Sequence, residues 1–216
     1  MGQGGALNRR RPVVRGGKPR RAPAWRRLVG LVGSGPEREA HEAGRALARC
    51  RSGGIPAALA ALMLDRRVPA RNAQEAAHVL AWRDDRRMAP AFVACVEDQA
   101  LPGPVRGMAA EALGMMFGCA AARKRAWRAA EGALLAALDD PVATVRFWSC
   151  YALGEMRSVR AVAALGRLRD GDEGCAPGWW YVHEEAADAL ARIAGRPGEE
   201  RVPVHLRTDG ESPRAG

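Results

Sequence analysis

Few residues of this 216-residue chain have the types and spacing that catalysis requires. His183 and Glu184 begin the HExxH pattern of zinc proteases, in which two histidines four residues apart share the metal. Residue 187 is Ala, so the second ligand is missing. The acidic pairs at residues 84–85 and 139–140 lie at predicted helix ends, where capping or pairing explains them better than acid–base catalysis. We therefore expect no metal site and no acid–base centre.

Other catalytic motifs are also missing from the sequence. It contains no GxxxxGK[ST] phosphate loop, no GxSxG nucleophile elbow and no GxGxxG motif opening a nucleotide-binding fold. The five cysteines form no CxxC pair, and most lie in or beside predicted helices, where a reduced cysteine acts as a small hydrophobe. We predict a protein without a cofactor that is not an enzyme, in a reducing cytoplasm.

Methionine and aromatic residues instead suggest a binding surface. They recur beside the predicted core face of successive helices, where they would contact a partner helix or peptide, or else pack between neighbouring helices. These residues are Trp82, Met108, Met115, Trp148 and Tyr151.

Trp179 and Trp180 form a second candidate contact, within an insertion at residues 170–181 that is rich in Gly and acidic residues. Aromatic side chains dominate the binding energy of many interfaces, so an exposed loop here would bind a partner. The alternative is that both indoles cover the open end of the molecule as a cap.

One helical pattern recurs along the chain. In residues 104–116, 144–156 and 181–193, Ala-Leu is followed by a small residue and then, two places on, by Met or Ile. Apolar residues at i, i+3, i+4 and i+7 share one helix face, so each copy predicts a helix with one buried stripe. The small residue favours close approach of a neighbouring helix. The repeated leucines, 33, 33, 40 and 37 residues apart, are Leu47, Leu80, Leu113, Leu153 and Leu190.

Each repeat is predicted to be a hairpin of two helices, because such a stripe is buried only when hairpins stack on one another. The predicted pairs span residues 25–32 and 37–50, 55–65 and 69–83, 88–97 and 104–117, 127–138 and 142–157, and 159–168 and 181–194.

The pattern resembles a HEAT repeat, most closely the short phycobilisome-lyase-like variety. The residues that carry the resemblance are Leu138-Asp-Asp-Pro-Val-Ala-Thr-Val-Arg146 with Cys150–Met156, and a second copy at Val105–Met116. The resemblance covers roughly residues 24–194. It implies an all-α, right-handed α-solenoid of about five HEAT-like hairpins, with the second helices lining the concave face.

The resemblance also implies a ladder of ion pairs between repeats, made by an acidic residue ending the first helix and an arginine opening the second. In the fifth repeat, His183 stands in place of the arginine. The matching residues are Asp98 with Arg106, Asp139 or Asp140 with Arg146, and Asp65 with Arg71.

The net charge of +10 is concentrated at the N-terminus, because residues 1–27 hold nine basic residues and no acidic one. The rest of the chain has 25 basic and 24 acidic residues. We predict a disordered basic arm at 1–22, a HEAT-like domain at 23–195 and a polar tail at 196–216. The arm is either a solvated tail, a start site placed too far upstream, or a contact for nucleic acid. That contact would be made by Arg9, Arg10, Arg11, Arg15, Lys18, Arg20 and Arg21.

The longest uncharged run is the 13 residues 52–64, shorter than the ~18 needed to cross a bilayer, so we expect no membrane span. The sequence favours a non-catalytic scaffold or adaptor that binds another protein through its concave face. One alternative is a phycobilin-lyase-type subunit, although no residue specifically signals a pigment. Another is a HEAT-type alkylpurine DNA glycosylase, which the nearly neutral body disfavours. The sequence does not identify the partner or the oligomeric state.

Overall fold

The computed structural model describes residues 22–118 and 125–207, and within them the chain is almost entirely helical. Three single-turn 3₁₀ segments, η1 (Arg86–Met88), η2 (Val159–Ala161) and η3 (Val204–Leu206), interrupt the connections. The helices are α1 (Ala24–Ser34), α2 (Glu37–Arg49), α3 (Ile55–Leu64), α4 (Ala70–Trp82), α5 (Ala89–Glu97), α6 (Gly103–Phe117), α7 (Arg125–Ala137), α8 (Ala143–Glu155), α9 (Val162–Gly171) and α10 (Val182–Ile193).

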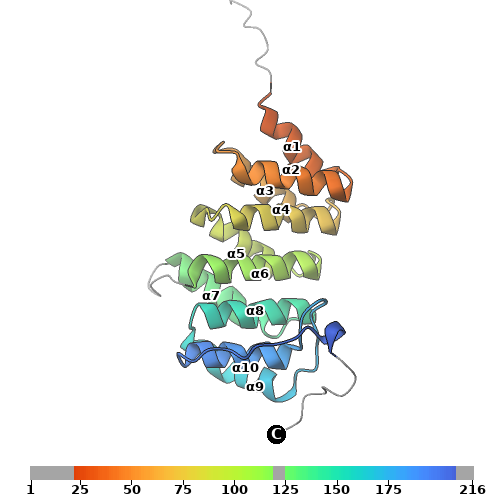
Figure 1. Ribbon diagram of the computed structural model, residues 1–216. Helices are drawn as coiled ribbons and strands as arrows, with labels where there is room; N and C mark the ends of the chain where they lie inside the picture. Colours follow the sequence, from red (N-terminus) through yellow and green to blue (C-terminus); the bar gives the residue numbers. More distant parts are fainter. Residues whose placement is uncertain (1–21, 119–124, 208–216) are drawn as a thin grey trace, which may run out of the picture.

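Consecutive helices pair into five hairpins that stack along one direction (Figure 1). The second helix of each hairpin packs on the second helix of the next, so α2, α4, α6, α8 and α10 form one layer. The first helices form the other layer. The expected all-α solenoid is confirmed, and every predicted helix boundary lies within three residues of the observed one.

Prolines fix where several helices begin. Pro36, Pro69 and Pro102 immediately precede α2, α4 and α6, with φ between −53° and −57°. A proline ring holds φ near this value and supplies no N–H, and the first residues of a helix have no intrahelical use for that donor. These three prolines therefore determine where the second helices of the first three hairpins begin.

The repeated leucines form the central row of the core. Leu47, Leu80, Leu113 and Leu153 have no exposed surface. Leu190 is only partly buried, because α10 belongs to the last hairpin and no further second helix covers it. The predicted seam is therefore continuous through four repeats and opens at the fifth.

Small residues allow the second helices to approach closely, as predicted. A Cβ atom on Gly114 would lie 2.7 Å from the Cα of Ala152, and one on Gly154 would lie 2.8 Å from the Cα of Ala189. Both distances are shorter than real Cβ contacts, so the backbones of α8 and α10 occupy the space that a side chain would need.

An ion-pair ladder joins successive repeats, but each arginine pairs with an acidic residue of the following hairpin. Arg106 also donates to the Leu101 carbonyl at 3.1 Å, and both it and its acidic partner are almost fully buried. The predicted pairs within each hairpin are wrong. Asp98 binds Arg66 and not Arg106, and Asp65 binds Arg67 at 2.8 Å and not Arg71. Arg146 binds Asp172 and the backbone carbonyl of Asp140 rather than the carboxylate of Asp139 or Asp140. The observed rungs are Arg66–Asp98, Arg106–Asp140 and Arg146–Asp172.

Some predictions concern residues outside the described ranges. These include the basic arm up to residue 21 and the tail from residue 208, so the three-part division of the chain and the nucleic-acid contact stay predictions. Among the described residues, no helix combines the length and apolar character that crossing a membrane requires.

Candidate partner-binding groove

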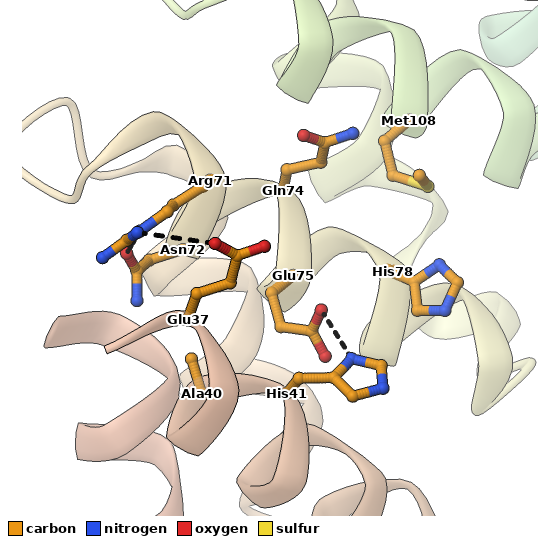
Figure 2. Close-up of a pocket in the computed structure, with 9 residues that line it drawn as sticks. All are labelled: Glu37, Ala40, His41, Arg71, Asn72, Gln74, Glu75, His78 and Met108. Carbon is orange, nitrogen blue, oxygen red and sulfur yellow. Dashed lines mark hydrogen bonds and ion pairs between the residues drawn. The ribbon is translucent and has the colours of Figure 1, made fainter. Parts of the chain in front are cut away.

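Three hollows follow one another along the face formed by the second helices. The first, about 360 Å³, lies between α2 and α4 (Figure 2). The second, about 500 Å³, lies toward the C-terminal ends of the same two helices. The third, about 450 Å³, lies between α4, α6, α8 and the loop that precedes α10. His78 of α4 lines all three, so they adjoin one another, and we call the three hollows together the second-helix groove.

The first hollow is polar. His41 Nδ1 lies 3.5 Å from a carboxylate oxygen of Glu75, and Arg71 lies 3.8 Å from Glu37 (Figure 2). Beneath them, the buried side-chain amide of Asn72 donates a hydrogen bond of 2.8 Å to the Val32 carbonyl. This bond fixes α4 against the end of α1. These contacts position the side chains but leave the hollow open.

The second hollow contains the most exposed aromatic residue among the predicted contacts. Trp82 at the end of α4 is 72% exposed, and its ring centroid lies 5.8 Å from that of His78. Exposed Arg45 and Arg49 of α2 stand on the opposite wall. This end of the groove presents an indole on one wall and two arginines on the other.

The third hollow is lined by methionine and two indoles. Trp148 of α8 and Trp179 of the loop have ring centroids 5.2 Å apart and ring planes at 79°, so they form two walls of a corner. Met108 and Glu111 of α6 also line it, and the remaining lining residues are Gln74, His78, Pro104, Thr144, Ala176 and Pro177. Gly107 makes this possible, because a Cβ there would lie 3.0 Å from Cδ1 of Trp148.

An aromatic cluster extends from this hollow toward the core. The buried ring of Phe147 lies 5.2 Å from Trp148 and 5.8 Å from Trp180, measured between centroids. Tyr151 packs edge-on against Trp148 at 5.6 Å. Edge-to-face contacts of this kind are favourable beyond the area they bury. The groove wall is therefore tied to the core of the fourth hairpin.

On the side facing the core, the aromatic cluster is bound by charged residues of α10. The Trp180 indole N–H donates to a carboxylate oxygen of Glu185 at 2.9 Å, and Arg192 donates to the other oxygen at 2.8 Å. Burial raises the pKa of Glu185, although these two donors oppose the shift. Arg192 also lies 3.3 Å from Glu155 and 5.5 Å from the centroid of the Tyr151 ring. Burial likewise raises the pKa of Tyr151.

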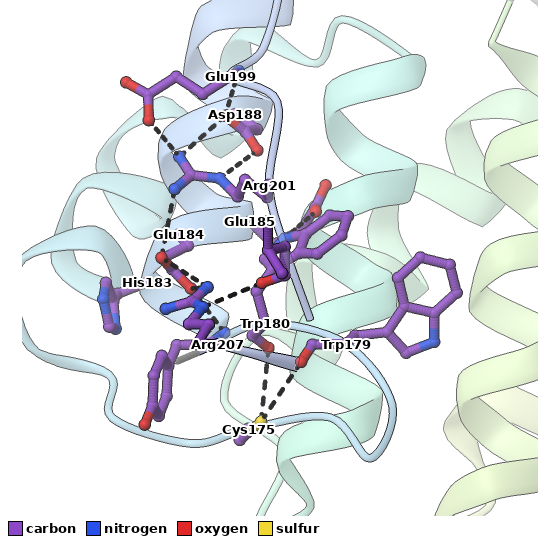
Figure 3. A network of polar contacts seen from close by, with 12 residues as sticks. Cys175, Trp179, Trp180, His183, Glu184, Glu185, Asp188, Glu199, Arg201 and Arg207 are labelled. Atoms are coloured by element: carbon purple, nitrogen blue, oxygen red, sulfur yellow. Dashed lines mark hydrogen bonds and ion pairs between the residues drawn. The ribbon is translucent and has the colours of Figure 1, made fainter. Parts of the chain in front are cut away.

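The segment 196–207 folds back along α10 and supports the tryptophan loop (Figure 3). Arg201 donates to Asp188 at 2.7 and 3.0 Å, and Arg207 donates to Glu184 at 2.8 Å. The Val204 N–H then donates to the carbonyl of Trp179 at 3.0 Å. Burial acts to raise the pKa of Glu184, but the bond from Arg207, the bond from the Tyr181 N–H and the charges of Arg207 and Arg201 together outweigh it, and the pKa is lowered.

The structure places the predicted contact residues on one face but not in one site. Trp148 and Trp179 meet in the third hollow, whereas Trp82 lies in the second. Met115 is half exposed on α6. The two loop indoles differ, because Trp180 is turned inward onto Glu185 while Trp179 keeps 40% of its surface exposed.

Sequence reasoning missed the residues that hold this site in place. Arg192, Arg201 and Arg207 pair with acidic groups 7 to 23 residues away in the chain. No local spacing signals such pairs. Phe147 was missed because it reads as an ordinary core residue, and it is indeed buried.

No family model and no curated protein sequence matches the chain. Among solved structures, it is similar to the complex of CpcE and CpcF of phycocyanin lyase from Nostoc sp. PCC7120. The TM-score is 0.58 and the identity 19%, over 79% of this chain and 96% of that chain. It is also similar to an engineered protein, with a TM-score of 0.51 and 22% identity over 80% of each chain. At these identities, the likeness shows a shared HEAT-repeat-like helical fold.

The expectation that the chain is not an enzyme is overturned by this similarity. It rested on the missing motifs of hydrolases, nucleotide enzymes and zinc proteases. The phycocyanin lyase contains a chain with the same course of helices, so this fold occurs in an enzyme complex. Missing motifs of other enzyme classes are therefore no argument against an enzymatic role.

Proposed function

We propose that the chain is a subunit of the phycobilin-lyase type, which holds a partner protein in its second-helix groove. The observation that carries the proposal is the row of three adjoining hollows from α2 to α8, which Met108 and the indoles of Trp82, Trp148 and Trp179 help to line. Grooves with these side chains suit a helix or an extended segment of another protein.

The similar structure supports this choice of partner class. The match covers 96% of a chain from the complex of CpcE and CpcF, so nearly the whole of that chain has a counterpart here. That structure is itself a complex between two proteins, as its name states. A protein partner is therefore the simplest proposal for this chain too.

We further propose which residues contact the partner. Trp82, Met115 and Trp179 have the most exposed surface and would make the first contacts. Met108, Trp148 and Tyr151 would contact it deeper in the groove, and Trp180 would hold the loop rather than reach the partner. Residues 23–195 form the binding domain in this proposal, with the segment 196–207 as a support for its loop.

Bilin attachment tests the lyase proposal. The chain would be co-expressed with apo-phycocyanin, a bilin and either CpcE or CpcF, so that it replaces the other lyase subunit. We expect covalently bound bilin, measured by the fluorescence of the phycocyanin band after denaturing electrophoresis. Bilin attachment by the native pair of subunits but by neither mixed pair contradicts the proposal.

A matched pair of variants tests the groove within the same assay. Trp82→Ala with Met115→Ala removes two exposed side chains of the second-helix face, and Val159→Ala with Val162→Ala removes two exposed side chains of the first-helix layer. All four side chains are exposed, so both variants should keep their melting temperatures. We expect the first variant to lose most of the attached bilin and the second to retain it.

A further inference from the structure

Acidic residues along the second-helix groove are paired with basic ones, with one exception. Glu111 of α6 receives no hydrogen bond or ion pair from residues 22–118 or 125–207, although it is half-buried. Burial raises the pKa of this carboxyl. The paired acids on this face are Glu37 with Arg71, Glu75 with His41, and Glu155 with Arg192.

Glu111 lies in a hollow with two aromatic walls, which Gln74, His78 and Thr144 also help to line. It lines the third hollow together with Met108, Trp148 and Trp179. The two indoles stand nearly at right angles, so they offer aromatic surface from two directions. Arg192 lies close to the neighbouring Tyr151, but Glu185 and Glu155 already bind it. The hollow thus combines a carboxylate with aromatic walls, has no arginine or lysine among its lining residues, and has His78 as its one basic side chain.

This combination recognises a cation. A positive group over the face of an indole is attracted by the ring, and a half-buried carboxylate adds a charged hydrogen-bond acceptor. Guanidinium fits better than ammonium, because it is planar, stacks on aromatic rings and is less strongly hydrated. A neutral ligand would bury the carboxylate without pairing it, which is unfavourable.

We propose that the third hollow receives an arginine side chain of the partner protein, with the guanidinium against Trp148 and Trp179 and paired with Glu111. The inference rests on the proposed function, because it takes the groove as the surface that binds the partner. It adds a requirement on the partner protein. The segment of the partner that lies in the groove must carry an arginine where it passes between α6 and α8.

The test uses the amino acid alone, so it does not require the partner. Nα-acetyl-arginine amide would be titrated into the protein while the indole N–H resonances of Trp148 and Trp179 are followed by NMR, assigned through single Trp→Phe variants. We expect these two resonances to shift together and to saturate. The citrulline analogue has the same shape without the charge, and the lysine analogue has the charge without the plane. Both should bind about tenfold more weakly.

Variants give the second arm of the test. Glu111→Gln should weaken arginine binding about tenfold, the loss expected for one hydrogen bond to a charged group. Trp179→Leu should weaken it several-fold, and Glu97→Gln, on the exposed end of α5, should not change it. Thermal melts would confirm that each variant is folded.

Equal binding of arginine and citrulline, equal binding of arginine and lysine, or an unchanged affinity in Glu111→Gln would overturn the inference. If the bilin assay succeeds while arginine fails to bind, the inference alone is wrong. If arginine binds but bilin attachment fails, the proposed function is wrong and the cation site stands.

Discussion

Gly114 and Gly154 set the separation of the second helices, because the backbones of α8 and α10 occupy the space beside them. Gly114→Ala should lower the free energy of unfolding by about 1–3 kcal/mol, since the added methyl group must push α8 away. Urea denaturation would measure the change.

Gly132 provides the matched control, because it lies within α7 with nothing within 4 Å of an added Cβ. Gly132→Ala should raise the free energy of unfolding by about 0.5–1 kcal/mol, through helix propensity alone. A destabilisation of similar size in both variants would mean that the close approach of α6 and α8 is not what Gly114 provides.

Because of Glu111, we predict that the free energy of unfolding depends on pH. Its carboxyl has a pKa raised by burial, so between the unfolded and folded values the unfolded chain binds fewer protons than the folded chain. Stability therefore falls as pH rises through this range. Glu111→Gln should melt at a higher temperature than the native protein at pH 7.

This advantage of Glu111→Gln should vanish below the unperturbed pKa of 4.5, where the carboxyl is protonated in both states. Melting curves between pH 3.5 and 7, followed by circular dichroism, would measure it. If the difference in melting temperature between Glu111→Gln and the native protein stays the same at every pH, desolvation of the Glu111 charge does not cause it.

At the scale of the elements, the ladder ties each hairpin to the next with unequal strength. Both partners of the Arg106–Asp140 rung are almost fully buried, whereas the Arg66 side chain is 63% exposed. Arg106→Met should cost about 3–5 kcal/mol, because it leaves a buried carboxylate unpaired. Arg66→Met should cost less than about 1 kcal/mol, as is typical of exposed pairs. If urea denaturation shows that both substitutions lower the free energy of unfolding by a similar amount, the Arg106–Asp140 pair is not more buried than the Arg66–Asp98 pair.

The segment after α10 gives a second prediction at this scale. A chain ending at Gly198 lacks Arg201 and Arg207, so Asp188 and Glu184 lose their partners and Trp179 loses the bond from Val204. We expect a lower melting temperature and stronger quenching of tryptophan fluorescence by acrylamide. A chain ending at Arg207 keeps all of these contacts and should behave as the full chain. Identical quenching in both truncated chains would mean that the segment does not support the loop.

The helices and the buried leucines could be predicted because periodic apolar residues act locally, through a single helix face. The ladder could be predicted only in outline, since Asp172 lies in an insertion and its partner Arg146 is 26 residues away. The different orientations of Trp179 and Trp180 could not be predicted, because they depend on Glu185 and on a segment that returns from beyond α10.

At the scale of the whole molecule, stacking of the hairpins brings their second helices into one layer, and three adjoining hollows form along it. These hollows join residues from α2 to the loop before α10, which are more than a hundred residues apart in the sequence. Motif searches do not detect such a surface, because its parts come from four helices and a loop that are spread over the chain. For the same reason, missing catalytic motifs are no argument against an enzymatic role.

The most direct test of the central claim is photocrosslinking in the cells from which the chain comes. A photoreactive amino acid would replace Trp82, Met108 or Trp179 in the groove, and Val159 or Val162 on the first-helix layer. Mass spectrometry would identify the crosslinked proteins. We expect the three groove positions to capture the same protein and the other two not to capture it. Capture of a common partner from residues 159 and 162, and not from the groove, would contradict the account.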